Sequence, residues 1–474
     1  MVLYLKKKII IIFIILAFIS LVISTRQIFG NISMDQLIFF IILDDGITGT
    51  DTSIFEKYLI NLIIIPLKYI ILILFIAILI DKIEFTKKII RYLFIPSLIV
   101  FLFFLLDKNI NLSALKQFFK KDNFSEYFVE IDKNLIEASK LKKKNLLFIY
   151  LESLETSYST TYEFDPNAPL NSFFNNKFLN IHQSHGVGWT IAGMIASQCG
   201  VPLSPFMSNN KFKNFNSGLL KNTTCLSDIL DEHGYYKEFI VGPHLKFSGM
   251  DKFYGTHKYD KMMGMKELIE YQNLLPDTLK ETNGWGGGVN DDQLFEIAYN
   301  RIKEINKTEN HFLYTLITTD GHSPNGMLSP RCDIKDKKIS GVPQFISVKH
   351  CTNLALVNFL KKLEEDKILD NTSVIVMGDH LFMNPPEYRK YFKKNRYVYL
   401  NFINKNDEIK INRYDINHYD VYPLALKLSL NLDFEKLHLG RSLSLKISEI
   451  DDHFETISKG KLNYKNSKPY LALY

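Results

Sequence analysis

The stretch Asn145-Leu-Leu-Phe-Ile-Tyr-Leu151, followed at once by Glu152 and Ser153, decides the fold of this chain. An uncharged run of this length predicts a buried strand. Further strand-like runs follow, with helix-like patterns between them, at 236–241, 312–317, 373–377 and 397–402 for strands and at 291–304 and 351–365 for helices. Alternating strands and helices indicate an α/β domain with a mostly parallel sheet and helices on both faces.

Polar residues at the strand ends are the first candidates for function, because ligands of such sheets bind at the carboxyl ends of the strands. Glu152 follows the first strand, and Asp379-His380 follows the run that begins at Ser373. If the two strands are neighbours, two carboxylates and an imidazole converge, and this donor set suits a divalent metal ion. Taken singly, each of these residues has a plainer reading as part of a helix cap.

A hydroxyl nucleophile is available at Thr190, which two glycines precede in Gly186-Val-Gly-Trp-Thr190. Small residues at helical spacing follow it, so we expect Thr190 in the first turn of a tightly packed helix. A helix N-terminus stabilises a bound phosphate. From local sequence alone, the commoner reading of Thr190 is a helix cap.

His322 lies in the loop after the strand-like run 312–317. An imidazole there can contact a phosphoryl group or move a proton during its transfer. The alternative is an ordinary surface-loop histidine.

The first 107 residues have a different character, with three apolar runs at 9–24, 58–80 and 92–106. These predict three membrane spans. The shorter piece at 34–45 predicts an interfacial segment on the outer side. Positive clusters at 6–8 and 82–91 should be cytoplasmic, which places everything after Asp107 on the far side of the membrane. Lys68 interrupts the second run and should face other helices, water or the interface.

These patterns divide the chain into four parts. We expect a transmembrane domain at 1–107, a helical connecting arm at 108–143, an extracytoplasmic catalytic domain at 144–450 and a C-terminal tail at 451–474.

The four cysteines, Cys199, Cys225, Cys332 and Cys351, all fall in the extracytoplasmic part. An even number in an exported domain predicts two disulfides, and four free buried thiols are the alternative. Three pairings are possible, and the shortest loops join Cys199 to Cys225 and Cys332 to Cys351.

The net charge is +6 over 474 residues. No long basic tract with interleaved aromatic residues appears, so nucleic acid is not expected as a partner. The lysines near the apolar runs fit anionic lipid headgroups better, although solvated lysines that only set the topology are the commoner reading.

Several of these stretches together resemble one family, the alkaline-phosphatase/sulfatase-like transferases. Within it the chain is similar to the phosphoglycerol transferase I family, and lipoteichoic acid synthases are more distant relatives. The resemblance spans roughly residues 145–445 and reaches into 34–52. It rests on Ile149–Glu155, Thr190–Pro202, Cys225–Leu230, Gly378–Leu381, Leu439–Ser442, the stretch from Trp285 to Asp292 and the four cysteine contexts.

The resemblance implies one divalent metal ion (manganese, zinc or magnesium) and assigns roles to individual residues. Thr190 matches the nucleophile, His322 matches a phosphoryl-contacting histidine, and the metal ligands are Glu152, Thr190, Asp379 and His380. Weaker matches to substrate-binding positions are Lys246, Asp291, Asp292 and Arg441. Lys246 stands where the family has an arginine, and a lysine cannot form the same bidentate contact.

The implied reaction moves glycerol phosphate from phosphatidylglycerol to a periplasmic or cell-surface glycan through a phospho-threonine intermediate. The enzyme would be a multi-pass protein of the bacterial inner membrane with its catalytic domain in the periplasm. Two alternatives remain open, a phosphoethanolamine transferase and a non-catalytic membrane scaffold. A sulfatase activity is set aside because the chain has no Cys/Ser-x-Pro-x-Arg sequence.

Overall fold

The computed structural model describes residues 33, 35, 36, 38, 39, 64, 68, 119–158, 164–175, 177–204, 218–272, 288–323, 325–332, 342–383, 386–405 and 407–474. The predicted spans at 9–24, 58–80 and 92–106, apart from residues 64 and 68, lie outside this set, as does much of the segment 34–45. Among the described residues, no helix is both long and apolar enough to cross a bilayer. The chain divides into two compact units, and the fold below is that of the larger one, Asp35–Gly49, Gln117–Phe382 and Lys390–Tyr474.

Eight strands of the described residues form one sheet in the order β4-β3-β5-β1-β6-β7-β2-β8. The five strands from β4 to β6 are mutually parallel, and β7 runs antiparallel to both β6 and β2. The predicted α/β class with a mostly parallel sheet is therefore confirmed. The strands are β1 (Asn145–Leu151), β2 (Leu179–His182), β3 (Tyr236–Val241), β4 (Lys261–Met263), β5 (Phe312–Ile317), β6 (Thr372–Gly378), β7 (Val398–Ile403) and β8 (Asp415–Asn417).

Strand β1 lies in the middle of the sheet, and its side chains alternate between two separate hydrophobic cores. Leu146, Phe148 and Tyr150 enter one core. Leu147 and Ile149 enter the other. Successive side chains of a strand point to opposite faces, so a strand covered on both sides must be apolar throughout. This is the physical reason for the uncharged run that begins at Asn145.

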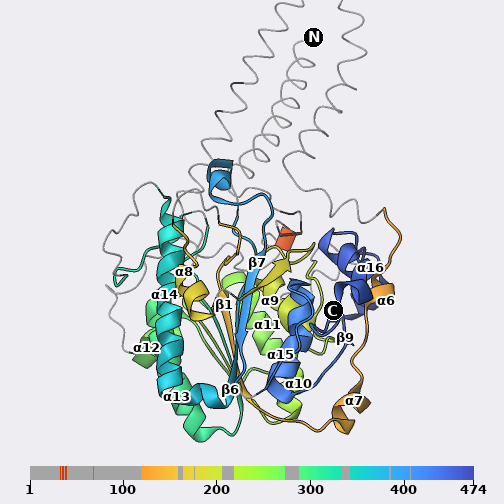
Figure 1. Ribbon diagram of the computed structural model, residues 1–474, viewed down its shortest axis with the longest axis horizontal. Helices are drawn as coiled ribbons and strands as arrows, with labels where there is room; N and C mark the ends of the chain where they lie inside the picture. Colours follow the sequence, from red (N-terminus) through yellow and green to blue (C-terminus); the bar gives the residue numbers. More distant parts are fainter. Residues whose placement is uncertain are drawn as a thin grey trace, which may run out of the picture. The chain divides into compact units, whose positions relative to one another are not determined.

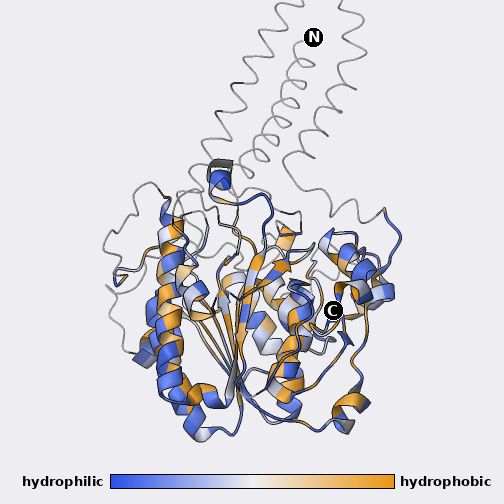
Figure 2. Cartoon of the chain, viewed as in Figure 1, coloured by the Kyte–Doolittle hydropathy of each residue, from blue (hydrophilic) through white to orange (hydrophobic). Residues whose placement is uncertain are grey.

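Helices cover both faces of the sheet (Figure 1), with α13 and α14 on one side and α9, α10 and α15 on the other. Helices α13 and α14 show alternating hydrophilic and hydrophobic colour along their length (Figure 2), and their buried apolar residues belong to the second core, whereas every residue of α9 is buried. The helices are α6 (Phe124–Tyr127), α7 (Lys133–Ala138), α8 (Ala168–Phe173), α9 (Thr190–Cys199), α10 (Leu226–Glu232), α11 (Met250–Thr256), α12 (Met265–Gln272), α13 (Asp291–Thr308), α14 (Gln344–Glu365), α15 (Val421–Leu430), α16 (Ile447–Ser458) and α17 (Lys468–Ala472).

The segments before and after the predicted catalytic domain pack onto it. In the described part of the arm, 119–143, the helices α6 and α7 are short, and Val129 pairs with His438 of the domain. The C-terminal residues carry α16 and α17, and Tyr464 and Tyr470 lie in the same core as helix α9. Both segments are thus structural parts of the larger unit.

Candidate metal centre and nucleophile

The register of β1 and β6 brings two carboxylates to one edge of the sheet. Leu151 pairs with Gly378, so Glu152 and Asp379 each follow at the same level. Ser153 lies between them with a left-handed backbone (φ 53°). Its main-chain N–H donates to Asp379 Oδ1 at 2.7 Å, and its hydroxyl donates to Glu152 Oε1 at 2.6 Å. Ser153 therefore fixes one oxygen of each carboxylate.

His380 completes a buried cluster with these carboxylates. Its Nε2 lies 3.3 Å from Asp379 Oδ2 and 3.6 Å from Glu152 Oε1. Its Nδ1 lies 2.8 Å from the Leu381 carbonyl oxygen, so Nδ1–H donates there and Nε2 faces the two carboxylates. Metal-binding histidines commonly use one nitrogen in this way to orient the other. One ligand atom of each of the three residues lies within 4.8 Å of the others.

The two buried carboxylates of the cluster would be stabilised by a bound cation. Glu152 Oε2 and Asp379 Oδ2 are buried without a hydrogen-bond partner. Burial alone would raise the pKa of Glu152, but interactions with neighbouring groups, among them the Lys349 ammonium and the Ser153 hydroxyl, outweigh burial and lower that pKa. Burial and the charge of Glu152 raise the pKa of Asp379 to about 6. Unpaired buried carboxylate oxygens are costly, and a divalent metal ion would satisfy both, so the residues fit the metal that the sequence implies.

Thr190 is the first residue of helix α9, at the same edge of the sheet. The N-cap is Trp189, not Thr190, and its side chain makes no capping hydrogen bond. One turn along the helix, Gly193 packs directly on the main-chain carbonyl of Asp379. Residues three apart share a helix face, so Thr190 lies on the face of α9 that meets the Asp379 strand end. Its side chain is buried, with 4% exposed.

His322 enters the same region from the end of β5, the other neighbour of β1. Its Nδ1–H donates to the Ser323 carbonyl oxygen at 2.9 Å, so the neutral ring is the tautomer that carries its hydrogen on Nδ1. Burial lowers the pKa of His322, although the nearby Glu152 opposes that shift. The cluster therefore carries a neutral imidazole suited to accepting a proton at neutral pH.

Asp291, the first residue of α13, supports the His322 loop. Its Oδ1 accepts hydrogen bonds from the main-chain N–H groups of Thr319 and Asp320, at 2.8 and 3.1 Å. Its Oδ2 accepts one from the Thr352 hydroxyl at 2.7 Å. These contacts give Asp291 a structural role, and the substrate contact that the sequence predicts for it stays a prediction.

Asp292 lines a pocket of about 210 Å³ between α13 and α14, where its Oδ2 lies 3.2 Å from Arg331 Nε. Arg441 on β10 (Gly440–Arg441) donates to the carbonyls of His438, Gly440 and Tyr127, and the substrate contact that the sequence predicts for it stays a prediction.

Lys246 is the N-cap of a short 3-10 turn, Phe247–Gly249. The ring of Phe247, the next residue, lies edge-on to the His322 ring, with 5.9 Å between the ring centroids. The loop that carries Lys246 thus borders the loop that carries His322.

Lys349 is a charged residue of the site that the sequence reasoning missed. It is buried on α14, and its Nζ donates to the main-chain carbonyl of Glu152. The Lys349 ammonium lies against Gly321, where a larger side chain would occupy the same space. Burial lowers the pKa of Lys349, although the charges of Glu152 and Asp379 oppose that shift. The sequence held one signal for the burial of Lys349. It lies four residues after the apolar Phe345, and this spacing places both residues on one face of a helix.

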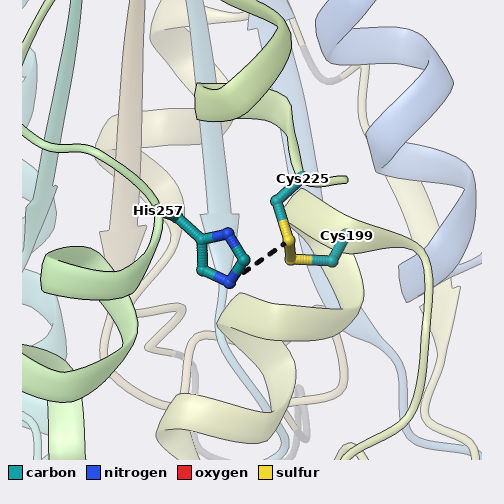
Figure 3. A group of neighbouring side chains, drawn as sticks. All are labelled: Cys199, Cys225 and His257. Carbon is teal, nitrogen blue, oxygen red and sulfur yellow. Dashed lines mark hydrogen bonds between the residues drawn. A yellow bond between two sulfur atoms is a disulfide. The ribbon is translucent and has the colours of Figure 1, made fainter. Parts of the chain in front are cut away.

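A second group of potential ligands, Cys199, Cys225 and His257, is explained by a disulfide (Figure 3). Cys199 is bonded to Cys225, and His257 Nε2 lies 3.7 Å from Cys225 Sγ. Cys332 is likewise bonded to Cys351. The pairing with the shortest loops is therefore confirmed.

Comparison with known proteins identifies the family to which this chain belongs. The family described as Sulfatase matches residues 144–423, and the chain belongs to that family. The resemblance to phosphoglycerol transferase I is also confirmed: over 348 residues the chain is 30% identical to the protein of that name from Escherichia coli (strain K12) and to that from Shigella flexneri. The match covers 72% of this chain and 44% of each relative, so the chain spans less than half the length of these relatives.

One solved structure supports the fold, and a second is reported beside it. A protein of the alkaline phosphatase superfamily from Vibrio parahaemolyticus has a TM-score of 0.50 at 21% identity, covering 68% of this chain and 76% of that one. The lipoteichoic acid synthase LtaP from Listeria monocytogenes has a TM-score of 0.49 at 17% identity, covering 66% of this chain and 81% of that one.

Proposed function

We propose that this chain is a membrane-bound phosphotransferase that moves glycerol phosphate from phosphatidylglycerol to a periplasmic or cell-surface glycan. The observation that carries the proposal is the convergence of Glu152, Asp379 and His380 at the sheet edge that the first turn of α9 meets. The similarity to proteins named phosphoglycerol transferase I supports the choice of donor. The proposed location is the bacterial inner membrane, with the site on the periplasmic side.

Glu152, Asp379, His380 and the Thr190 hydroxyl would hold one divalent ion, manganese, zinc or magnesium. When bound, such an ion stabilises negative charge on a phosphoryl group and favours the deprotonated form of a nearby hydroxyl. The N-terminus of α9 adds its positive dipole end at Thr190.

In the first half-reaction, the Thr190 oxygen attacks the phosphorus of phosphatidylglycerol. The bond from phosphorus to the diacylglycerol oxygen breaks, and diacylglycerol leaves with the proton that Thr190 gave up. A glycerophospho-threonine remains. In the second half-reaction, His322 Nε2 accepts the proton of a glycan hydroxyl while that oxygen attacks phosphorus. The bond to Thr190 breaks, and the proton returns to the Thr190 oxygen, so that atoms and charges balance.

The direct test is to trap the intermediate. Protein incubated with phosphatidylglycerol vesicles and no acceptor should gain the mass of glycerophosphate on the peptide that contains Thr190. Transfer by a Thr190→Ala variant would show the mechanism to be wrong. Metal analysis of the purified protein separates the enzyme from a scaffold, which would hold no stoichiometric ion.

The resemblance places Lys246 where the phosphoglycerol transferase family has an arginine, which leaves the glycerol-headgroup contact open and makes phosphatidylethanolamine the second candidate donor. Phosphatidylethanolamine offered side by side with phosphatidylglycerol therefore decides between the two headgroups. Mass spectrometry of surface glycans from cells with and without the protein then identifies the acceptor.

A further inference from the structure

A short segment far from the site in sequence packs beside the nucleophile. Residues 35–39 lie between the first and second predicted spans, yet they belong to the same compact unit as the sheet. Asp35 and Phe39 are both buried, with 0% and 1% exposed. Phe39 is part of the core that also contains Trp189 and Tyr464.

Phe39 contacts the residue that starts the nucleophile helix. Its ring centroid lies 5.9 Å from that of Trp189, at an interplanar angle of 45°. Trp189 is the N-cap of α9, and its carbonyl accepts the hydrogen bond from Gly193 N–H at 3.0 Å that begins the helix ladder. Thr190 is the next residue, so the position of the Trp189 backbone sets the position of the nucleophile.

Asp35 anchors the same segment to the loop that follows the C-terminal end of α9. Its Oδ1 lies 2.6 Å from Lys465 Nζ, and both side chains are at most 1% exposed. The Ser204 hydroxyl donates to the same oxygen at 2.7 Å and accepts from Lys465 Nζ at 2.9 Å. Ser204 lies in the loop that follows α9 and Lys465 lies near the C-terminus, so the segment touches the loops on both sides of the nucleophile helix.

A buried ion pair of this kind holds only while both partners are present. Removal of Asp35 would leave the Lys465 ammonium buried without its counter-charge, which is strongly unfavourable. The loops around α9 are tightly packed, because a side chain at Gly186 would meet the Tyr464 hydroxyl and Pro202. Loss of the anchor must therefore disturb the loops that frame α9.

We propose that residues 35–39 are a positioning element of the catalytic site, in which Phe39 holds Trp189 and thereby Thr190, and the Asp35–Lys465 pair fixes the segment in place. This inference rests on the proposed function for its kinetic readout. Since residues 35–39 lie between two predicted spans, the nucleophile is tied to the part of the chain expected at the membrane surface.

The test uses the full chain in detergent with Trp285→Phe as the common background. The chain has two tryptophans, so Trp189 is then the sole tryptophan and is excited at a wavelength that tyrosine does not absorb. Variants Phe39→Ala and Phe39→Leu are compared with Ile38→Ala, a partly exposed neighbour in the same segment. The kinetic probe is bis(p-nitrophenyl) phosphate, an activated phosphodiester that makes no assumption about the donor lipid. Burst amplitude counts the competent sites, and the rate constant of the burst reports the attack by Thr190, so unfolded protein does not affect that rate constant.

For Phe39→Ala we expect red-shifted, more readily quenched Trp189 emission and a burst rate constant roughly tenfold lower, as a displaced nucleophile would give. Phe39→Leu should recover most of both signals, and Ile38→Ala should match the background. A parental burst rate constant in Phe39→Ala overturns the proposal, and so does an equal loss in Ile38→Ala.

Separate variants test the Asp35–Lys465 ion pair. Asp35→Asn should shift Trp189 emission, and the double variant Asp35→Asn/Lys465→Met should partly restore it because no unpaired charge remains buried. Unchanged emission in Asp35→Asn overturns the anchoring role. A background protein that turns over neither the nitrophenyl diester nor phosphatidylglycerol overturns the proposed function instead, and Trp189 emission alone then decides whether the segment holds residue 189.

Discussion

Gly193 of helix α9 lies directly against the main-chain carbonyl of Asp379, with no room for a side chain between them. The carbonyl also accepts a hydrogen bond from His418 Nε2–H at 2.9 Å, so it cannot move away freely. This contact sets the distance between the helix that carries Thr190 and the strand end that carries the predicted metal ligands.

The first prediction follows from that contact. Gly193→Ala places a methyl group into the Asp379 carbonyl and pushes α9 away, so the rate of adduct formation at Thr190 should fall by roughly 10²-fold. Stability should fall by about 1–3 kcal/mol from overpacking. Stopped-flow kinetics and urea unfolding measure the two effects.

Gly255→Ala is the matched control for Gly193→Ala. A Cβ at 255 in α11 would meet only Met262 Cε, at 3.8 Å. This variant should keep the parental rate and gain about 0.5 kcal/mol, because alanine suits a helix better than glycine. A parental rate in Gly193→Ala would refute the idea that this contact positions the nucleophile.

The second prediction concerns metal removal. Chelation should abolish adduct formation at Thr190, and one equivalent of a divalent ion should restore it. Saturation at 100 times the dissociation constant should stabilise the fold by about 2.7 kcal/mol. Glu152→Gln should lose the bound equivalent, whereas Glu155→Gln should retain it, since Glu155 is paired with Arg396 instead. Metal analysis that finds an equal ion content in both variants would exclude Glu152 as a ligand.

The third prediction is a pH dependence. The folded-state pKa of Asp379 is raised to about 6, above its ordinary value. In the metal-free protein, the stability linked to Asp379 is therefore fully present below about pH 4. It is lost as the pH rises through about 6. Metal binding requires the ionised form, so the rise in melting temperature caused by metal should be larger at pH 7.5 than at pH 5. An equal rise at both pH values would argue against Asp379 as a ligand.

The fourth prediction concerns Lys349, whose charge lowers the pKa of both Glu152 and Asp379. In Lys349→Met those pKa values should rise, so the acid limb of metal binding should move up by about one pH unit. Affinity at pH 8 should not fall, because both carboxyl groups are ionised there. Lys362→Met, exposed on the same helix, serves as the control. Isothermal titration across pH 5–8 measures the shift, and an unmoved acid limb in Lys349→Met would contradict this role.

Much of the site could be predicted because its signals are local. An apolar run that ends in Glu152, and another that ends in Asp379-His380, can be read residue by residue. The strand order could not, since β1 and β6 are adjacent only because surfaces more than 200 residues apart in the chain fit together. Lys349 was missed for a related reason, as its burial depends on the helix face that meets the sheet.

The sequence by itself determined the α/β class, the predicted divalent-metal donors Glu152, Asp379 and His380, and the candidate nucleophile Thr190, because strand periodicity and strand ends are properties of neighbouring residues. Tertiary structure alone decided which ends converge, that Asp291 supports the His322 loop, and that Phe39 and Lys465 meet the loops around α9. These outcomes depend on packing between distant segments, where the fit of shapes and the pairing of buried charges select one arrangement that no local pattern records.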